Sequence, residues 1–155
     1  MSGLYIHVPF CKQACHYCDF HFSTSSGGQL EMVRAMAKEI TLQKKFLNTP
    51  LDSVYFGGGT PSLLNQVLLD ILLDSVHANF SIPPTAEITL EANPDDLNKE
   101  KLVALRKSGI NRLSIGIQSF DDAILRYLNR AHDSKMHTLA CPTPGKLAST
   151  ISVWI

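Results

Sequence analysis

Apolar residues along this chain switch repeatedly between the two periods of regular secondary structure. Short runs that alternate, or that are rich in β-branched and aromatic residues, end at Pro9, Gly57, Asn93 and Gln118. Each run is followed by a stretch in which apolar residues recur every three or four positions. The first pattern is typical of strands and the second of amphipathic helices, so the sequence predicts four strand-then-helix units.

The expected strands cover residues 4–8, 53–56, 87–91 and 112–117, and the expected helices cover residues 30–47, 64–72, 97–105 and 121–128. Asn98 and Asp121 are candidate N-caps, and Gly109 suits the left-handed position after the third helix. Strict alternation with right-handed crossovers predicts an α/β fold, with a parallel sheet that curls toward a partial TIM-like barrel. Functional groups of such folds lie at the carboxyl ends of the strands.

The pattern changes after Met136. Two prolines and a glycine fall within residues 142–145, and no helical period completes the last unit. We therefore expect residues 1–136 to form one domain of four units and residues 137–155 to form an atypical, irregular tail. A barrel interrupted at this point indicates truncation or a shifted reading frame, and it leaves an open sheet edge.

Composition places the chain among ordinary globular proteins. Of its 155 residues, 45% are hydrophobic and 18% are charged, and 14 basic residues balance 14 acidic ones. A chain without net charge has no electrostatic attraction for nucleic acid. Polar residues interrupt the longest apolar stretch, residues 63–76, so we expect no membrane span. Without a recognisable signal peptide or a paired-cysteine pattern, we expect a cytoplasmic protein.

The most distinctive stretch, residues 11–18, carries three thiols. Cys11, Cys15 and Cys18 can converge from one loop onto an iron–sulfur cluster or a zinc ion. A cubane cluster has four irons, so three cysteines leave one iron open to another ligand. We favour the cluster. A zinc site completed by His16 or His21 is less favoured because the ligands form only one group, and a disulfide because their number is odd.

The distinctive residues all follow predicted strands. The cysteines follow the first strand, the glycine run at residues 57–59 follows the second, Glu91 closes the third and Gln118 closes the fourth. Carboxyl ends of parallel strands meet at one edge, so we expect these residues to share a site. Cys141 lies far from them and is expected to be an ordinary thiol.

These separated motifs resemble the radical S-adenosylmethionine (SAM) family, in its coproporphyrinogen-oxidase-like branch. The resemblance covers about residues 4–136 and rests on the cysteine spacing together with residues 5–11, 57–61, 87–94 and 109–120. It implies that Cys11, Cys15 and Cys18 hold a [4Fe–4S] cluster and that SAM chelates the fourth iron. A reduced cluster of low potential would supply the electron that cleaves SAM, so an electron donor is also implied.

The resemblance also implies a set of SAM-contacting residues: Tyr5, Tyr17, Gly58, Gly59, Thr60, Glu91, Gln118 and Arg130. Within this set the glycines and Thr60 would meet the methionyl group, and a Cβ on either glycine would obstruct that approach. Tyr17 would lie near the adenine and Glu91 would accept hydrogen bonds from the ribose. Each assignment has a structural alternative. Tyr17 could simply pack in its loop, Glu91 could form a salt bridge at the rim, and the glycines could form an ordinary turn.

One position separates two branches of the family. Oxygen-independent coproporphyrinogen oxidases carry a further cysteine two residues after the third ligand, where this chain has Phe20. The resemblance therefore favours HemW-type heme chaperones, with heme as cargo and a heme-accepting protein as partner. The alternatives are an enzyme that oxidatively decarboxylates porphyrinogen propionates, and an inactive fragment that lacks half of the barrel wall. No catalytic residue is assigned.

Overall fold

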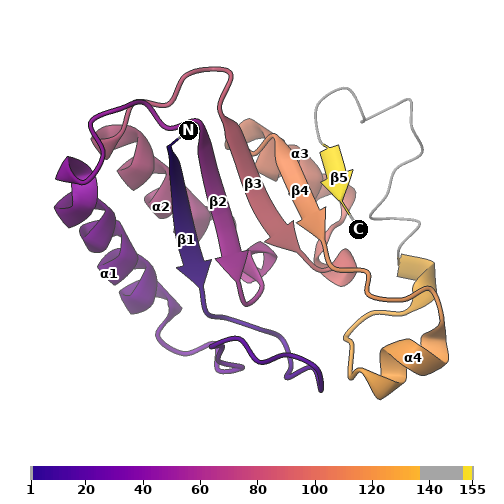
Figure 1. Cartoon of the computed structure of the whole chain (residues 1–155). Helices are drawn as coiled ribbons and strands as arrows, with labels where there is room; N and C mark the ends of the chain where they lie inside the picture. The colour runs from indigo at the N-terminus through magenta and orange to yellow at the C-terminus, as the bar shows by residue number, and fades with distance from the viewer. Residues whose placement is uncertain (1, 137–151, 155) are drawn as a thin grey trace.

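A parallel sheet forms the centre of the molecule, and its strands lie side by side in chain order. The computed structural model describes residues 2–136 and 152–154. Within them, the strands are β1 (Gly3–Val8), β2 (Ser53–Gly58), β3 (Glu87–Ala92), β4 (Arg112–Ile115) and β5 (Ser152–Trp154). All pairings are parallel, and in Figure 1 all the arrowheads point to the same edge of the sheet. The predicted α/β fold with four β/α units is confirmed.

Helices connect the strands, as is usual between parallel strands. They are α1 (Gln29–Leu42), α2 (Gln66–Asn79), α3 (Lys99–Lys107) and α4 (Asp122–Tyr127), with the 3₁₀ turns η1 (Gln43–Lys45), η2 (Pro61–Leu63), η3 (Pro94–Asp96) and η4 (Ser134–Met136). Both predicted N-caps are confirmed, because the Asn98 side chain accepts from Lys101 N and that of Asp121 from Ala123 N. Gly109 has the expected positive φ of 95°. In the described part of the chain, no helix is both long and apolar enough to cross a membrane.

Alternation along the strands gives the sheet two different faces. Ile6 and Val8 of β1 are buried in one apolar cluster with side chains of the other strands and of the helices, including Val33 of α1 and Leu72 of α2. Removing each such side chain from water contributes about 1.5–3 kcal/mol. The residues that alternate with them, Tyr5 and His7, point to the opposite face and stay exposed or partly exposed. The helix-covered face therefore stabilises the strands, and the other face carries the polar groups.

The first helix and the fourth strand are shorter than predicted. The first helix ends at Leu42, and Leu47 packs on the core from the segment after η1, so its apolar spacing reflects burial rather than helix. The fourth strand ends at Ile115, because the chain turns at Gly116 and Gln118 adopts a φ of 67°.

The three described residues of the tail are in a strand, which the predicted irregular conformation did not include. Ser152–Trp154 form β5, which pairs with residues 112–114 of β4. Its β-branched and aromatic residues suit a strand, but the prolines and glycine before it suggested otherwise. Residues 137–151, including Cys141, lie outside the described part of the chain.

Candidate cofactor-binding site

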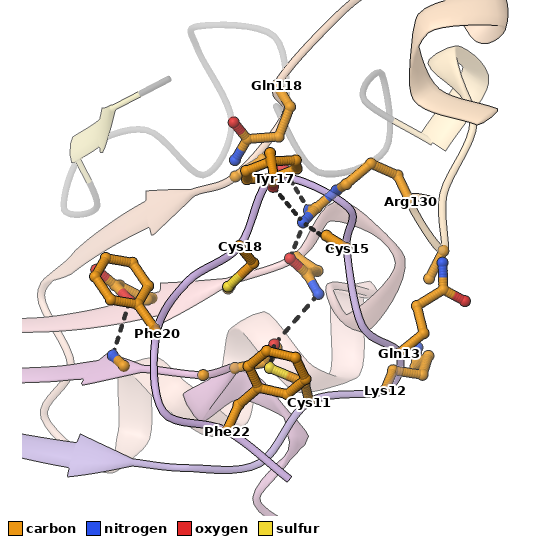
Figure 2. Close-up of a pocket in the computed structure, with 18 of the residues that line it drawn as sticks. Cys11, Lys12, Gln13, Cys15, Tyr17, Cys18, Phe20, Phe22, Gln118 and Arg130 are labelled. Carbon is orange, nitrogen blue, oxygen red and sulfur yellow. Dashed lines mark hydrogen bonds between the residues drawn. The ribbon is translucent and has the colours of Figure 1, made fainter. Parts of the chain in front are cut away.

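A cavity of about 230 Å³ lies at the carboxyl edge of the sheet, where the four strand-end motifs meet. Figure 2 shows side chains from the cysteine loop, Gln118 and Arg130 gathered around it. The predicted site residues that line it are Cys11, Cys15, Tyr17, Cys18, Gly58, Gly59, Thr60, Glu91, Gln118 and Arg130. The expectation that one edge of the sheet collects these motifs is therefore met by the geometry.

Tyr5 lies apart from this group. Its ring stacks on that of Tyr55 at a centroid distance of 6.0 Å, and its hydroxyl is 3.4 Å from His7 Nδ1. It lines a groove between β1 and α1 instead of the cavity. Tyr5 reaches the cavity only indirectly, because the Tyr55 hydroxyl donates to Glu91.

The three cysteines enter the cavity from one loop, and all three are partly buried. A turn closes the loop, since Cys18 N donates to Cys15 O at 3.1 Å. Burial raises the pKa of the Cys11 thiol, the hydrogen bond from Thr60 lowers it, and the neighbouring thiols raise it further. A thiolate at Cys11 would gain from a cationic metal centre, which stabilises the deprotonated form.

The spacing of the ligands in space bears on which metal they suit. In the described part of the chain, no three His, Cys, Asp or Glu side chains come together as ligands for a single metal ion. A cubane cluster does not need such convergence, because each cysteine binds a different iron. The arrangement of the three thiols is therefore consistent with a cluster.

The glycine loop forms the part of the wall beside Phe10 and Cys11. A Cβ on Gly59 would lie 2.7 Å from Phe10 O and 2.9 Å from Val8 O, and one on Gly58 would lie 2.6 Å from the His7 ring. Gly58 also has a φ of 107°. The sequence was expected to need glycine here for a ligand's approach, but the protein's own backbone and His7 already require it.

Thr60 and Glu91 already form hydrogen bonds with other residues of the chain. Thr60 N donates to Phe10 O at 2.6 Å, and its hydroxyl donates to Cys11 Sγ at 3.6 Å. Glu91 accepts from the Tyr55 hydroxyl at 2.7 Å and from Gly58 N at 3.2 Å. No ion pair of Glu91 occurs among the described residues, so the rim salt bridge is not what holds it. Its carboxylate keeps lone pairs free for a further donor.

Arg130 is the most highly connected side chain of the cavity. Its Nη1 donates to Tyr17 Oη at 3.1 Å and to Cys15 Sγ at 3.5 Å, and Figure 2 shows it directed at both. Its Nη2 donates to Asn93 Oδ1 and to Gly116 O, each at 2.7 Å. Its buried Nε has no partner among the described residues, although buried donors are rarely left unpaired.

Sequence reasoning missed several lining residues, among them Asn93, Lys12 and Phe22. Asn93 directly follows the third strand, so the strand-end rule that selected Glu91 would also have selected it. Lys12 lies between the cysteines and reaches Asp95 and Asp96. Phe20, which distinguished the two branches, lines the cavity and is 71% exposed.

This fold and this site define a class of protein. A family model described as the radical SAM superfamily matches residues 5–140, and the chain belongs to that superfamily. Membership implies a [4Fe–4S] cluster and SAM in general terms. The cavity fits such groups, since it offers three thiols on one loop and an unpaired buried guanidinium donor beside them.

Individual members of the superfamily are similar to most of this chain. The chain is 39% identical over 140 residues to the heme chaperone HemW of Bacillus subtilis, covering 87% of this chain and 36% of that protein. It is 38% identical over 134 residues to HemW of Escherichia coli, covering 84% and 35%. The solved structure of coproporphyrinogen III oxidase (HemN) from Escherichia coli superposes with a TM-score of 0.80 at 30% identity, covering 87% and 32%. The chain thus spans about a third of the length of these relatives.

Proposed function

We propose that this chain is the cluster- and SAM-binding part of a HemW-type heme chaperone. The observation that carries the proposal is the meeting of ten expected site residues in one cavity, nine from the ends of four strands and Arg130 from the segment after α4. Similarity to HemW from several bacteria supports the same branch. Heme would be the cargo, and a heme-accepting protein and an electron donor would be the partners.

Each wall of the cavity would have its own task. Cys11, Cys15 and Cys18 would hold the cluster, and Arg130 would pair with the carboxylate of SAM, for which its Nε is a donor left free among the described residues. Glu91 would accept hydrogen bonds from ribose hydroxyls, and Tyr17 would pack on the adenine. When bound, the reduced cluster and SAM supply one-electron chemistry, and the protein's task is to position them and exclude water.

Phe20 is the reason to prefer a chaperone to an oxidase. An exposed phenylalanine at the cavity offers an apolar face but no thiol. A flat, mostly apolar tetrapyrrole can pack on such a ring. The second candidate, oxidative decarboxylation of coproporphyrinogen, is favoured by the likeness to HemN and by the shared cluster loop.

Anaerobic reconstitution with iron and sulfide tests the cluster. We expect one [4Fe–4S] cluster per chain, loss of it in Cys11→Ala, Cys15→Ala and Cys18→Ala, and no loss in Cys141→Ala. The readouts are iron and sulfide content and the visible absorption of the cluster. Stoichiometric zinc uptake without iron–sulfur absorption would overturn the assignment.

Electron paramagnetic resonance (EPR) of the reduced cluster tests the SAM site. Adding SAM should change the spectrum, because its amino and carboxylate groups would ligate the open iron. Glu91→Gln should load cluster normally but bind SAM about tenfold more weakly, since an amide accepts ribose hydrogen bonds less well than a carboxylate. An unchanged spectrum in well-loaded wild-type protein would count against the site.

A chimera separates the two candidates. Residues 1–136 can be joined to the part of Bacillus subtilis HemW that follows the matched segment, and the product compared with a Phe20→Cys version. We expect both to bind heme and neither to convert coproporphyrinogen anaerobically with SAM and a reductant. Conversion by the Phe20 protein would establish the oxidase instead.

A further inference from the structure

Hydrogen bonds link two of the three cluster cysteines across the cavity. Arg130 donates to Cys15 Sγ at 3.5 Å and to Asn93 Oδ1 at 2.7 Å. Asn93 Nδ2 in turn donates to Thr60 Oγ1 at 3.5 Å, and Thr60 donates to Cys11 Sγ at 3.6 Å. Figure 2 draws the first of these hydrogen bonds, from Arg130 to Cys15, as a dashed line. Asn93 is the midpoint of this path.

The backbone at Asn93 is fixed independently of the cavity. Pro94 follows it and disfavours the helical region, and Asn93 has φ −92° and ψ 149°. Asn93 N donates to Ser62 Oγ at 3.4 Å, and Ser62 is held by Asp96 at 2.6 Å. The amide is therefore presented from a rigid position at the end of β3.

Other asparagines of the chain show what a purely structural role looks like. Both ends of the Asn111 amide bind backbone, since it accepts from Ile88 N and donates to Ala86 O, each at 2.8 Å. Asn98 caps α3. The Asn93 amide binds no backbone group among the described residues, and both of its ends serve side chains that line the cavity.

We infer that Asn93 is a positioning residue, which orients Arg130 and Thr60 so that each donates a hydrogen bond to a cluster cysteine. The inference rests on the proposed function. Hydrogen bonds to cysteine sulfur raise the reduction potential of an iron–sulfur cluster, and outer residues that orient such donors tune the metal centre. Asn93 would therefore act on the cluster through its two neighbours without touching it.

The test is an EPR-monitored redox titration of four loaded proteins: wild type, Asn93→Leu, Thr60→Val and the double variant. Leucine and valine keep the side-chain shape but remove the hydrogen-bonding groups. We expect both single variants to shift the midpoint potential to lower values. The double variant should shift it by less than the sum, because Asn93 acts partly through Thr60. Affinity for SAM should fall about tenfold in Asn93→Leu, since Arg130 loses its orientation.

Asn98→Ala is the matched control. It should lower the stability of the fold by removing the cap of α3, yet leave the potential and the SAM affinity unchanged. If Asn93→Leu fails to fold, the smaller Asn93→Ala takes its place with the same expected shift.

Wild-type potential in the loaded Asn93 variant, or strictly additive shifts, would overturn the inference while leaving the proposed function intact. Wild-type protein that loads no cluster would instead overturn the proposed function and this inference with it.

Discussion

The glycine loop (residues 57–60) and the cysteine loop (residues 11–18) both line one cavity, but the protein fixes them in different ways. The glycine loop is held by the strand beside it. Gly59 N donates to Val8 O at 2.8 Å and Thr60 N to Phe10 O at 2.6 Å, so the loop extends the β1–β2 pairing.

The cysteine loop is held mainly by a distant segment. His16 N donates to Leu128 O at 3.1 Å, and the Asn129 side chain donates to Ala14 O at 2.7 Å. Gln13 returns a hydrogen bond to Asn129 O at 2.5 Å. More than a hundred residues separate these partners in the sequence. The segment after α4 is thus the support on which the ligand loop rests.

Lys12 supplies a second support on the other side. Its Nζ pairs with Asp95 and, at 2.9 Å, with Asp96, whose side chains are only 8% and 7% exposed. Burial lowers the pKa of Lys12, but the hydrogen bonds from its ammonium to the two carboxylates outweigh this and raise the pKa overall. The glycine loop is therefore held by the adjacent strand, whereas the cysteine loop is held by residues that are distant in the sequence. The residues expected to bind the cluster and the residues that hold them in place belong to separate parts of the chain.

The largest expected effect is in the glycine loop. Gly59→Ala should lower the free energy of unfolding by about 3 kcal/mol, because the new Cβ would meet the Phe10 backbone at 2.7 Å and backbone atoms cannot rotate away. Chemical denaturation measures the loss. Gly27→Ala is the control, since its Cβ would lie 3.5 Å from its nearest neighbour, Ser25 Oγ. Equal stability of the two variants would show that a clash with the Phe10 backbone is not what requires glycine at position 59.

The next effect concerns the Lys12 support. Lys12→Met should destabilise the fold by about 2 kcal/mol at neutral pH, because two nearly buried carboxylates lose their counter-charge. The lysine itself is partly exposed, which keeps the loss below that expected for a fully buried ion pair. Adding Asp95→Asn should recover part of the loss. Lys38→Met, at an exposed position of α1, is the surface control. If the added Asp95→Asn instead deepens the loss, charge repulsion is not its cause.

A smaller effect is expected in the segment after α4. Asn129 has a φ of 56°, which asparagine and glycine tolerate better than alanine. Asn129→Ala should cost about 1–2 kcal/mol and speed cluster loss to a chelator, since it removes both the favoured conformation and the hydrogen bond to Ala14. Asn129→Gly restores only the conformation and should recover part of the stability but little of the cluster retention. Full recovery of both would mean that the side chain does not hold the loop.

The same contrast explains what the sequence could reveal. Strand positions and the edge they share follow from local periodicity and one topological rule, which is why Cys11, Thr60, Glu91 and Gln118 could be brought together in advance. The supports could not, because the pairing of Asn129 with Ala14 depends on where the chain turns after α4. The motif singled out Gly58 and Gly59, but only the structure shows that Phe10 and His7 also require glycine there, since a motif records which residue is needed but not which atoms require it.

The smallest expected effect is at Asp122, at the start of the helix α4 whose following segment supports the cysteine loop. Asp122 Oδ1 accepts from Ser134 N at 2.8 Å, which closes the segment that carries Arg130. This hydrogen bond lowers the pKa of the Asp122 carboxyl below its ordinary value of 3.8. Because the folded pKa is the lower one, the carboxylate contributes stability at pH values above 3.8, and the contribution is lost as the pH falls through the folded pKa.

Asp122→Asn keeps an acceptor for Ser134 but cannot titrate, so its unfolding free energy should decline less steeply than that of wild type as the pH falls from neutral to below 3.8. Urea denaturation across that range gives the two slopes. Asp74→Asn, at an exposed position of α2, should follow the wild-type curve. Identical slopes for Asp122→Asn and wild type would show that the Ser134 contact does not couple protonation to folding.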